Sequence, residues 1–256
     1  MDIVVPMKLI PDLVEELELL DDESGLDPDA VELKLNEFDE HALEEALFLK
    51  ESKGGTVTVV ALDGEGAEDA LYAGIAKGAD RAIRVTGGPE EGADTRLTAR
   101  LFASVLKGQQ FDLIFTGVQA ADDRVGQLSP LLAAELELPH VSVVTDVEIE
   151  GNVAVVNQEY AGGVMGRFEV DLPAVLGIQA AGKAPRYVPI SKLRQVMKTE
   201  SIDEAEGSVD GEIAVAMVRR MYKPAKTRSA EMIEGEPEEV AEKIFTILQE
   251  KGILKG

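Results

Sequence analysis

The first half of the chain alternates short apolar runs with longer stretches in which apolar residues recur at helical spacing. The short runs, rich in β-branched residues, predict strands over residues 3–7, 56–62, 81–85 and 112–116. The helical spacing predicts helices over residues 38–50, 67–77, 95–107 and 126–137. In the first helix we expect Glu44, Glu45 and Glu51 to face solvent, because they fall outside its apolar positions. Strands that alternate with helices are typical of a parallel sheet covered by helices.

After Leu138-Pro139 the pattern changes. Residues 141–148 and 152–159 alternate apolar and polar positions around a Glu-Gly-Asn turn, which is typical of a β-hairpin. Further strands are predicted over residues 166–170, 174–178 and 215–222, and an amphipathic helix over residues 237–251. The polar residues 201–210 predict an exposed loop or linker. The predicted fold class is therefore α/β, an open, mostly parallel sheet with a C-terminal arm.

The charge of the chain narrows the classes of partner. Its 256 residues include 25 Lys and Arg against 49 Asp and Glu, a net charge of −24. Nucleic acid and anionic membranes are not expected as partners, because both require a basic surface. The acids are scattered through almost every segment, which favours the salt-adapted surface of a halophile over one acidic docking patch. Apolar residues still make up 45% of the chain, enough for a sizeable core.

The sequence also limits the chemistry that the chain can perform. It has no Cys and two His, so thiol chemistry and zinc sites are not expected. We interpret His41 as a solvated or capping residue and His140 as the cap of a strand. Neither a Gly-x-Gly-x-x-Gly fingerprint nor a Walker A sequence occurs, and we expect no metal site and no self-sufficient catalytic site. Without a basic leader or a run of about 20 apolar residues, the protein is expected to be soluble and cytoplasmic.

The segment most typical of a ligand site follows the fourth predicted strand. Residues 116–130 form a polar loop of small residues that leads directly into a helix. In open α/β sheets, ligands bind at the carboxyl ends of the strands, and a helix N-terminus supplies free amides for an anion. Arg124 would add positive charge there. An ordinary strand–helix loop explains the same residues equally well.

A second polar cluster, residues 36–40, opens the first predicted helix. Asn36 is a good N-cap, and Asp39 three residues later nearly completes a capping box, which is a sufficient structural explanation. A binding role would require this cluster to lie beside the loop after the first strand. A sheet with that strand at its centre would bring the two together.

Six short pieces occur in a characteristic order along the chain. They are residues 4–8 (VVPMK), 36–46 (NEFDEHALEEA), 78–82 (GADRA), 117–122 (GVQAAD), 172–175 (LPAV) and 185–187 (PRY). In these pieces, and over essentially its whole length, the chain resembles the beta subunit of electron transfer flavoproteins.

The resemblance implies an adenine-nucleotide-alpha-hydrolase-like (Rossmann-like) fold and a heterodimer whose alpha subunit holds most of the redox FAD. In this family the beta subunit buries AMP or, in electron-bifurcating members, a second FAD. The chain contains neither the Cys-Asn-Gln-Thr-Gly loop of AMP-binding members nor the Asp-Gly-Asp-Thr-Ala-Gln loop of bifurcating members, so both nucleotides stay open. The matching positions imply a nucleotide site at Pro6, Lys8, Asn36, Glu37, Phe38, Asp39, Gly64, Asp122, Asp123, Arg124, Val125, Gly126, Gln127 and Leu128.

The resemblance also implies surfaces for other proteins. Ile190 matches the apolar side chain through which the family's recognition loop docks dehydrogenases, although a place in a local core is the simpler interpretation of Ile190 alone. Glu159 matches an acidic position that pairs with an arginine of the alpha subunit. We expect a nucleotide-binding core (1–180), a recognition loop and arm (181–235) and a C-terminal helix on the alpha subunit (236–256). Basic residues gather near the recognition loop, namely Lys183, Arg186, Lys192, Arg194 and Lys198.

The implied function is that of an electron carrier and not of an enzyme. The heterodimer would take electrons from acyl-CoA dehydrogenase-type flavoenzymes, as in fatty acid oxidation, and pass them to a quinone oxidoreductase. Two alternatives stay open. A bifurcating complex would use NADH and a second FAD on this subunit. A stand-alone nucleotide-binding module of universal-stress type would share the fold but have neither an alpha subunit nor a redox partner.

Overall fold

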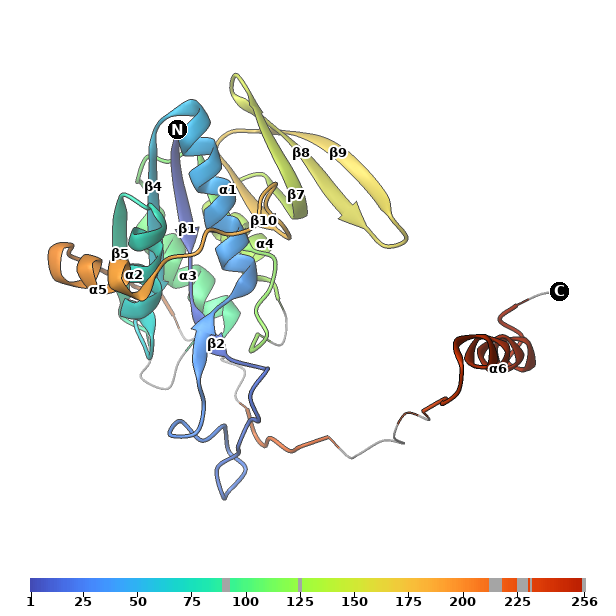
Figure 1. The fold of residues 1–256 in the computed structure, drawn as a ribbon. Helices are drawn as coiled ribbons and strands as arrows, with labels where there is room; N and C mark the ends of the chain where they lie inside the picture. The colour runs from blue at the N-terminus through green and yellow to red at the C-terminus, as the bar shows by residue number, and fades with distance from the viewer. Residues whose placement is uncertain (89–92, 124–125, 212–217, 225–229, 231, 255–256) are drawn as a thin grey trace.

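A mixed sheet forms the centre of the protein. The computed structural model describes residues 1–88, 93–123, 126–211, 218–224, 230 and 232–254. Within these residues the sheet has nine strands in the order β11-β5-β4-β1-β6-β10-β7-β8-β9 (Figure 1). The strands are β1 (Asp2–Pro6), β4 (Thr56–Leu62), β5 (Arg81–Thr86), β6 (Leu113–Gly117), β7 (His140–Glu150), β8 (Val153–Tyr160), β9 (Val164–Asp171), β10 (Ala174–Ile178) and β11 (Asp203–Glu206). Pairing is parallel from β11 to β7 and antiparallel in the β7–β8 and β8–β9 pairs.

Helices cover both faces of the parallel strands. Figure 1 shows α1 (Glu37–Lys53) and α2 (Ala67–Lys77) in front of the sheet, with α3 (Thr95–Leu106) and α4 (Leu128–Leu136) behind it. Successive residues of β1 point to opposite faces, so Ile3 and Val5 pack under α1 and α2 while Val4 joins the core under α3 and α4. Burial on both faces explains the continuous apolar runs of these strands.

The predicted α/β architecture is confirmed. The strands predicted over residues 56–62 and 174–178 and the helix over 67–77 match to the residue, and the remaining predicted elements of the core differ by a few residues at their ends. The predicted hairpin is the β7–β8 pair. Strand β1 lies between β4 and β6, so the first strand is central as the binding hypothesis required.

Several predictions beyond the core were wrong. Residues 203–206, predicted to be loop, form the edge strand β11, because β5 offers unpaired backbone groups and its Arg81 and Arg84 pair with Asp203 and Glu204. The segment expected to be a recognition loop and arm (181–235) contains a helix that was not predicted, α5 (Ile190–Thr199). Of the strand predicted over 215–222, residues 215–217 lie outside the described residues, and 218–222 form no strand.

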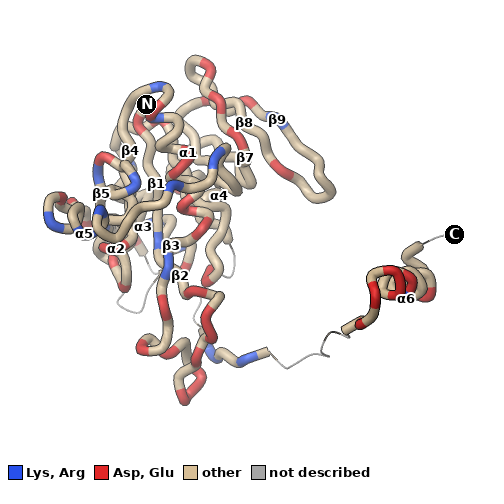
Figure 2. Tube along the Cα trace, viewed as in Figure 1, with Lys and Arg blue, Asp and Glu red and all other residues tan. Residues whose placement is uncertain are grey.

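Three segments project from the core. Strands β2 (Leu9–Pro11) and β3 (Leu33–Leu35) form a small antiparallel ladder whose connecting loop, residues 12–32, carries many acids (Figure 2). The β8–β9 hairpin extends from the sheet edge, and α6 (Pro237–Glu250) lies apart from the core (Figure 1). None of the residues of α6, all described, is buried. Among the described helices, none is long and apolar enough to cross a lipid bilayer.

Candidate functional site

The order of the strands reverses beside β1. The chain runs from β1 outward through β4 to β5, then returns to place β6 on the other side of β1. In open α/β sheets this switch point, at the carboxyl ends of the strands, is where ligands bind. Here the switch point brings together the loop after β1, the start of α1 and the loop between β6 and α4. We call this the strand-end site and define it by Lys8, Asn36, Asp39, Gly117 and Asp122.

Asn36 joins two of these loops. It occupies the N-cap position of α1, but its side chain makes no capping hydrogen bond, so the capping interpretation was wrong. Its Nδ2 instead donates to the carbonyl oxygen of Gln119 at 2.9 Å, and its backbone N–H donates to the carbonyl oxygen of Lys8 at 3.1 Å. With 2% of its surface exposed, Asn36 therefore acts as a buried link between the β1, α1 and β6 segments.

Asp39 extends the same link. Its Oδ2 accepts the backbone N–H of Lys8 at 3.1 Å, and its Oδ1 accepts the backbone N–H of Gly117 at 3.2 Å. Burial raises the pKa of this carboxyl from 3.8 to about 7, although the Asn36 side chain, the Lys8 charge and both backbone donors oppose that shift. Because both oxygens accept backbone donors, Asp39 holds the loops of the site in place.

Gly117 is a residue of the site that the predicted set did not include. A Cβ at this position would lie 2.4 Å from Oδ1 of Asp39 and 2.8 Å from Cβ of Phe38. The first turn of α1 therefore approaches β6 so closely that a side chain would not fit. The signal available in the sequence was a glycine at the end of a buried strand, directly before the loop with ligand character.

Two further contacts tie the β6–α4 loop to its neighbours. Lys8 Nζ pairs with Asp122 Oδ1 at 2.7 Å, and Thr95 Oγ1 donates to Asp123 Oδ1 at 2.7 Å. The Lys8 side chain is 44% exposed and that of Asp122 33%, so this pair lies at the surface of the site. The predicted residues Arg124 and Val125 lie outside the described residues.

The remaining predicted residues take different places. Pro6 is the buried last residue of β1, Phe38 is half-buried beside Gly117, and Gly64 is exposed in the loop after the adjacent strand β4. At the start of α4 lie Gly126, Gln127 and Leu128; α4 begins at Leu128, two residues later than predicted. Glu37 differs from this group, because its exposed carboxylate pairs with Lys34 at 3.1 Å.

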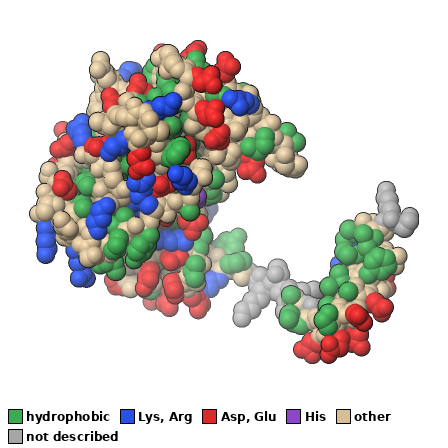
Figure 3. Space-filling model, turned by 45° about the horizontal axis from the view of Figure 1, so that its top comes forward, with side chains coloured by type: hydrophobic (Ala, Val, Ile, Leu, Met, Phe, Trp, Pro, Cys, Tyr) green, Lys and Arg blue, Asp and Glu red, His purple; other side chains and the backbone are tan. Residues whose placement is uncertain are grey.

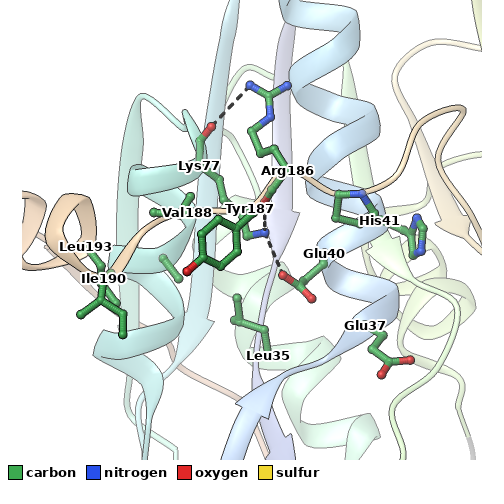
Figure 4. A pocket seen from close by; sticks show the side chains of 12 residues that line it. Leu35, Glu37, Glu40, His41, Lys77, Arg186, Tyr187, Val188, Ile190 and Leu193 are labelled. Carbon is green, nitrogen blue, oxygen red and sulfur yellow. Dashed lines mark hydrogen bonds and ion pairs between the residues drawn. The ribbon is translucent and has the colours of Figure 1, made fainter.

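A cavity of about 500 Å³ is lined by the start of α1, by α2 and by residues 185–193, and its lining includes the predicted residue Glu37. Glu40, Lys77, Tyr187 and Ile190 are among the side chains that line it (Figure 4). Ile190, the first residue of α5, is 64% exposed, so its interpretation as a core residue was wrong. The predicted partner residue Glu159 is exposed on β8.

Of the two histidines, His41 differs from its interpretation, whereas His140 lies at the end of a strand as expected. His41 neither caps a helix nor stays free in solvent, because its Nδ1 accepts the backbone N–H of Ala181 at 3.1 Å. His140 begins β7, and its buried Nε2 has no hydrogen-bond partner among the described residues. Burial lowers the pKa of His140. Among the described residues, no group of three or more acidic or histidine side chains is placed to hold a metal ion.

Comparison with known proteins shows the family. The model of the electron transfer flavoprotein domain matches residues 25–228. The chain is 36% identical to the electron transfer flavoprotein subunit beta of Methylophilus methylotrophus, with 98% of each chain covered. It is 35% identical to the subunit beta of Syntrophomonas wolfei, covering 94% of this chain and 93% of that protein. It is 30% identical to the subunit beta of Bacillus subtilis, covering 97% and 98%. These matches cover nearly the whole length of each protein and agree with the switch-point fold. They show that the chain belongs to the beta-subunit family of electron transfer flavoproteins.

Proposed function

We propose that this chain binds AMP at the strand-end site and forms a heterodimer with an alpha subunit that carries FAD. The complex receives electrons from acyl-CoA dehydrogenase-type flavoenzymes and delivers them to a quinone oxidoreductase. The observation that carries the nucleotide site is the buried Asn36–Asp39 linkage at the switch point, which fixes three loops where α/β sheets bind nucleotides.

The site suits a phosphate despite the net charge of −24. The N-terminus of α4 provides backbone amides with the positive end of a helix dipole, and Lys8 adds a cationic side chain at the surface of the site. Binding through backbone amides needs few basic residues. When bound, AMP would fill the site and support the fold without taking part in electron transfer.

Two projecting segments are suited to contact the alpha subunit. The β8–β9 hairpin exposes Tyr160, Val164, Met165 and Phe168, next to the predicted contact Glu159. Helix α6 exposes apolar side chains that include Phe245, and Figure 3 shows apolar and acidic side chains gathered on different sides of this helix. Exposed apolar side chains on segments that project from the core are typical of a protein interface.

The surface for electron donors is the segment around Ile190. An exposed isoleucine at the start of a helix, beside Tyr187 and a cavity, can place one apolar anchor in a partner's pocket. A small interface of this kind supports transient binding, because a few residues carry most of its affinity. In this proposal the chain makes and breaks no bonds itself; it positions the flavin of the alpha subunit and its donors.

Identifying the nucleotides of the purified complex tests the proposal. The chain is co-expressed with an alpha subunit from the same genome, and the complex is denatured to release its nucleotides. We expect a yellow 1:1 heterodimer that releases one FAD and one AMP. Two FAD and no AMP would instead establish the bifurcating alternative, and a colourless protein without an alpha subunit would favour the stand-alone module.

A further inference from the structure

Residues 181–186, which connect the core to α5, are bound by side chains of α1. The backbone N–H of Ala181 donates to Nδ1 of His41 at 3.1 Å, and that of Gly182 donates to Oε2 of Glu45 at 3.1 Å. The backbone N–H of Arg186 donates to Glu44 Oε2 at 2.9 Å. We call residues 181–186 the tethered segment. Because its amides bond to side chains, its position depends on the identity of residues on α1.

Arg186 makes the most extensive contacts of this segment. Its Nη2 donates to Glu44 Oε1 and its Nε to Glu44 Oε2, both at 2.9 Å, which is a bidentate pair. Its Nη1 donates to Glu51 Oε1 at 2.8 Å. Its carbonyl oxygen accepts Lys77 Nζ at 2.8 Å, and the same nitrogen pairs with Glu40 at 2.8 Å (Figure 4). Arg186 is thereby bound through its side chain, its N–H and its carbonyl group.

The burial of Glu44 shows that this pair is built into the fold. Glu44 is 6% exposed and Glu45 3%, so the prediction that these two side chains face solvent was wrong; Lys77 beside them is 8% exposed. Burial by itself would raise the pKa of Glu44, but the hydrogen bonds from Arg186 hold it below its usual value. The Glu44 hydrogen bond likewise raises the pKa of Arg186. A buried carboxylate without its guanidinium would be strongly unfavourable, so each partner requires the other.

The tethered segment ends where the proposed docking surface begins. Tyr187 follows Arg186 directly and is 84% exposed, and Ile190 lies three residues further on. On the far side, α5 packs against α2 and buries Val196. Residues 187–190 are therefore held at both ends, although Tyr187, Pro189 and Ile190 are exposed and only Val188 is half-buried.

We propose that the Glu44–Arg186 pair is a positioning device that pre-forms the docking surface at Tyr187 and Ile190 for an electron-donating flavoenzyme. This inference rests on the proposed docking function. A loop held in its bound geometry does not lose conformational entropy when the partner arrives, so the pair increases affinity without touching the partner. Loss of the pair would therefore weaken docking while flavin binding is kept.

Two variants of the heterodimer test the role of the pair. Glu44→Gln keeps the size of the side chain but removes its charge, and Arg186→Lys keeps a charge but removes the bidentate geometry. The matched control is Glu135→Gln, because Glu135 also pairs with an arginine, Arg100 at 3.6 Å, on the opposite face of the sheet. Hydrogen exchange of residues 181–193 reports the order of the segment. Steady-state assays report KM for the heterodimer and kcat with an acyl-CoA dehydrogenase as electron donor.

We expect both variants to exchange amides of residues 181–193 about tenfold faster and to raise KM about tenfold, with kcat and flavin content unchanged. The control should match wild type in all readouts. Unchanged exchange, or faster exchange with unchanged KM, would overturn the positioning role. If Glu44→Gln fails to fold, Arg186→Lys decides. A wild-type complex that accepts no electrons would refute the proposed function and this docking role with it. An active wild-type complex whose variants keep the wild-type exchange rates or KM would refute only the positioning role.

Discussion

A single methyl group at residue 117 tests the geometry of the strand-end site. In Gly117→Ala, the new Cβ would lie 2.4 Å from Asp39 Oδ1, 2.8 Å from Phe38 Cβ and 2.9 Å from the backbone nitrogen of Asp39. All of these distances are shorter than normal contacts. The first turn of α1 would have to move away from β6, and the hydrogen bond from Gly117 N–H to Asp39 would lengthen or break.

The size of the effect follows from these contacts. Overpacking a buried site costs about 1–3 kcal/mol, and the displaced hydrogen bond to a buried carboxylate costs about 1–3 kcal/mol more. We therefore expect Gly117→Ala to lower the free energy of unfolding by about 2–6 kcal/mol. For a chain of this length that corresponds to a fall in Tm of roughly 4–24 °C. The same movement separates Lys8 from the β6 loop, so bound nucleotide should decrease as well.

Thermal unfolding of the heterodimer at fixed concentration, together with the nucleotide content, measures both effects. Gly25→Ala is the matched control, because its new Cβ would have Leu20 Cδ1 as nearest neighbour at 3.9 Å. That variant should stay within about 1 kcal/mol of wild type. If Gly117→Ala unfolds like the control and keeps its nucleotide, the Asp39 contacts do not hold the site together.

Three further predictions concern charge. Asp39 has a pKa of about 7 in the folded protein against 3.8 in the unfolded chain, so its contribution to stability is complete below pH 4 and is lost as pH rises through 7. Denaturant titrations between pH 5 and 8 should show that wild type loses about 2–3 kcal/mol more of its free energy of unfolding than Asp39→Asn. An equal loss in the two proteins would contradict the raised pKa of Asp39. Lys8→Met should lower the amount of AMP retained but change the free energy of unfolding by less than about 1 kcal/mol, because the Lys8–Asp122 pair is partly exposed. If Lys8→Met retains as much AMP as a Lys107→Met control, Lys8 is not part of the nucleotide site. If the acidic surface is a halophilic adaptation, Tm should fall when KCl is lowered from about 1 M to about 0.1 M, because the screening length grows from roughly 3 to 10 Å, and a constant Tm would argue against it.

The elements of the core could be predicted from sequence because their apolar pattern is local. Residues 56–62 are apolar enough to be recognised as a strand buried on both faces, and residues 67–77 carry a helical repeat. The edge strand β11 could not be recognised, because its Asp-Glu-Ala-Glu sequence favours a strand only beside β5 and its arginines. Its structure is decided by tertiary contacts.

The strand-end site was placed correctly along the chain, but its internal contacts were not. Asn36 and Asp39 fit a capping box locally, yet in the structure they bond to Gln119, Lys8 and Gly117. Glu44 was assigned to solvent because its partner Arg186 lies 142 residues further along the chain. A single sequence shows the period of a helix but not which distant segment will cover it.

Reduction of the flavin in the assembled complex tests the central claim most directly. The heterodimer of this chain and its alpha subunit is mixed with an acyl-CoA dehydrogenase reduced by its substrate. Bleaching of the flavin of the heterodimer is followed by stopped flow. We predict fast bleaching for wild type and bleaching at least about tenfold slower for Ile190→Ala at limiting concentrations, with equal FAD and AMP content. Equal rates for the two proteins, or no bleaching of wild type, would contradict the claim that this chain docks electron donors through Ile190.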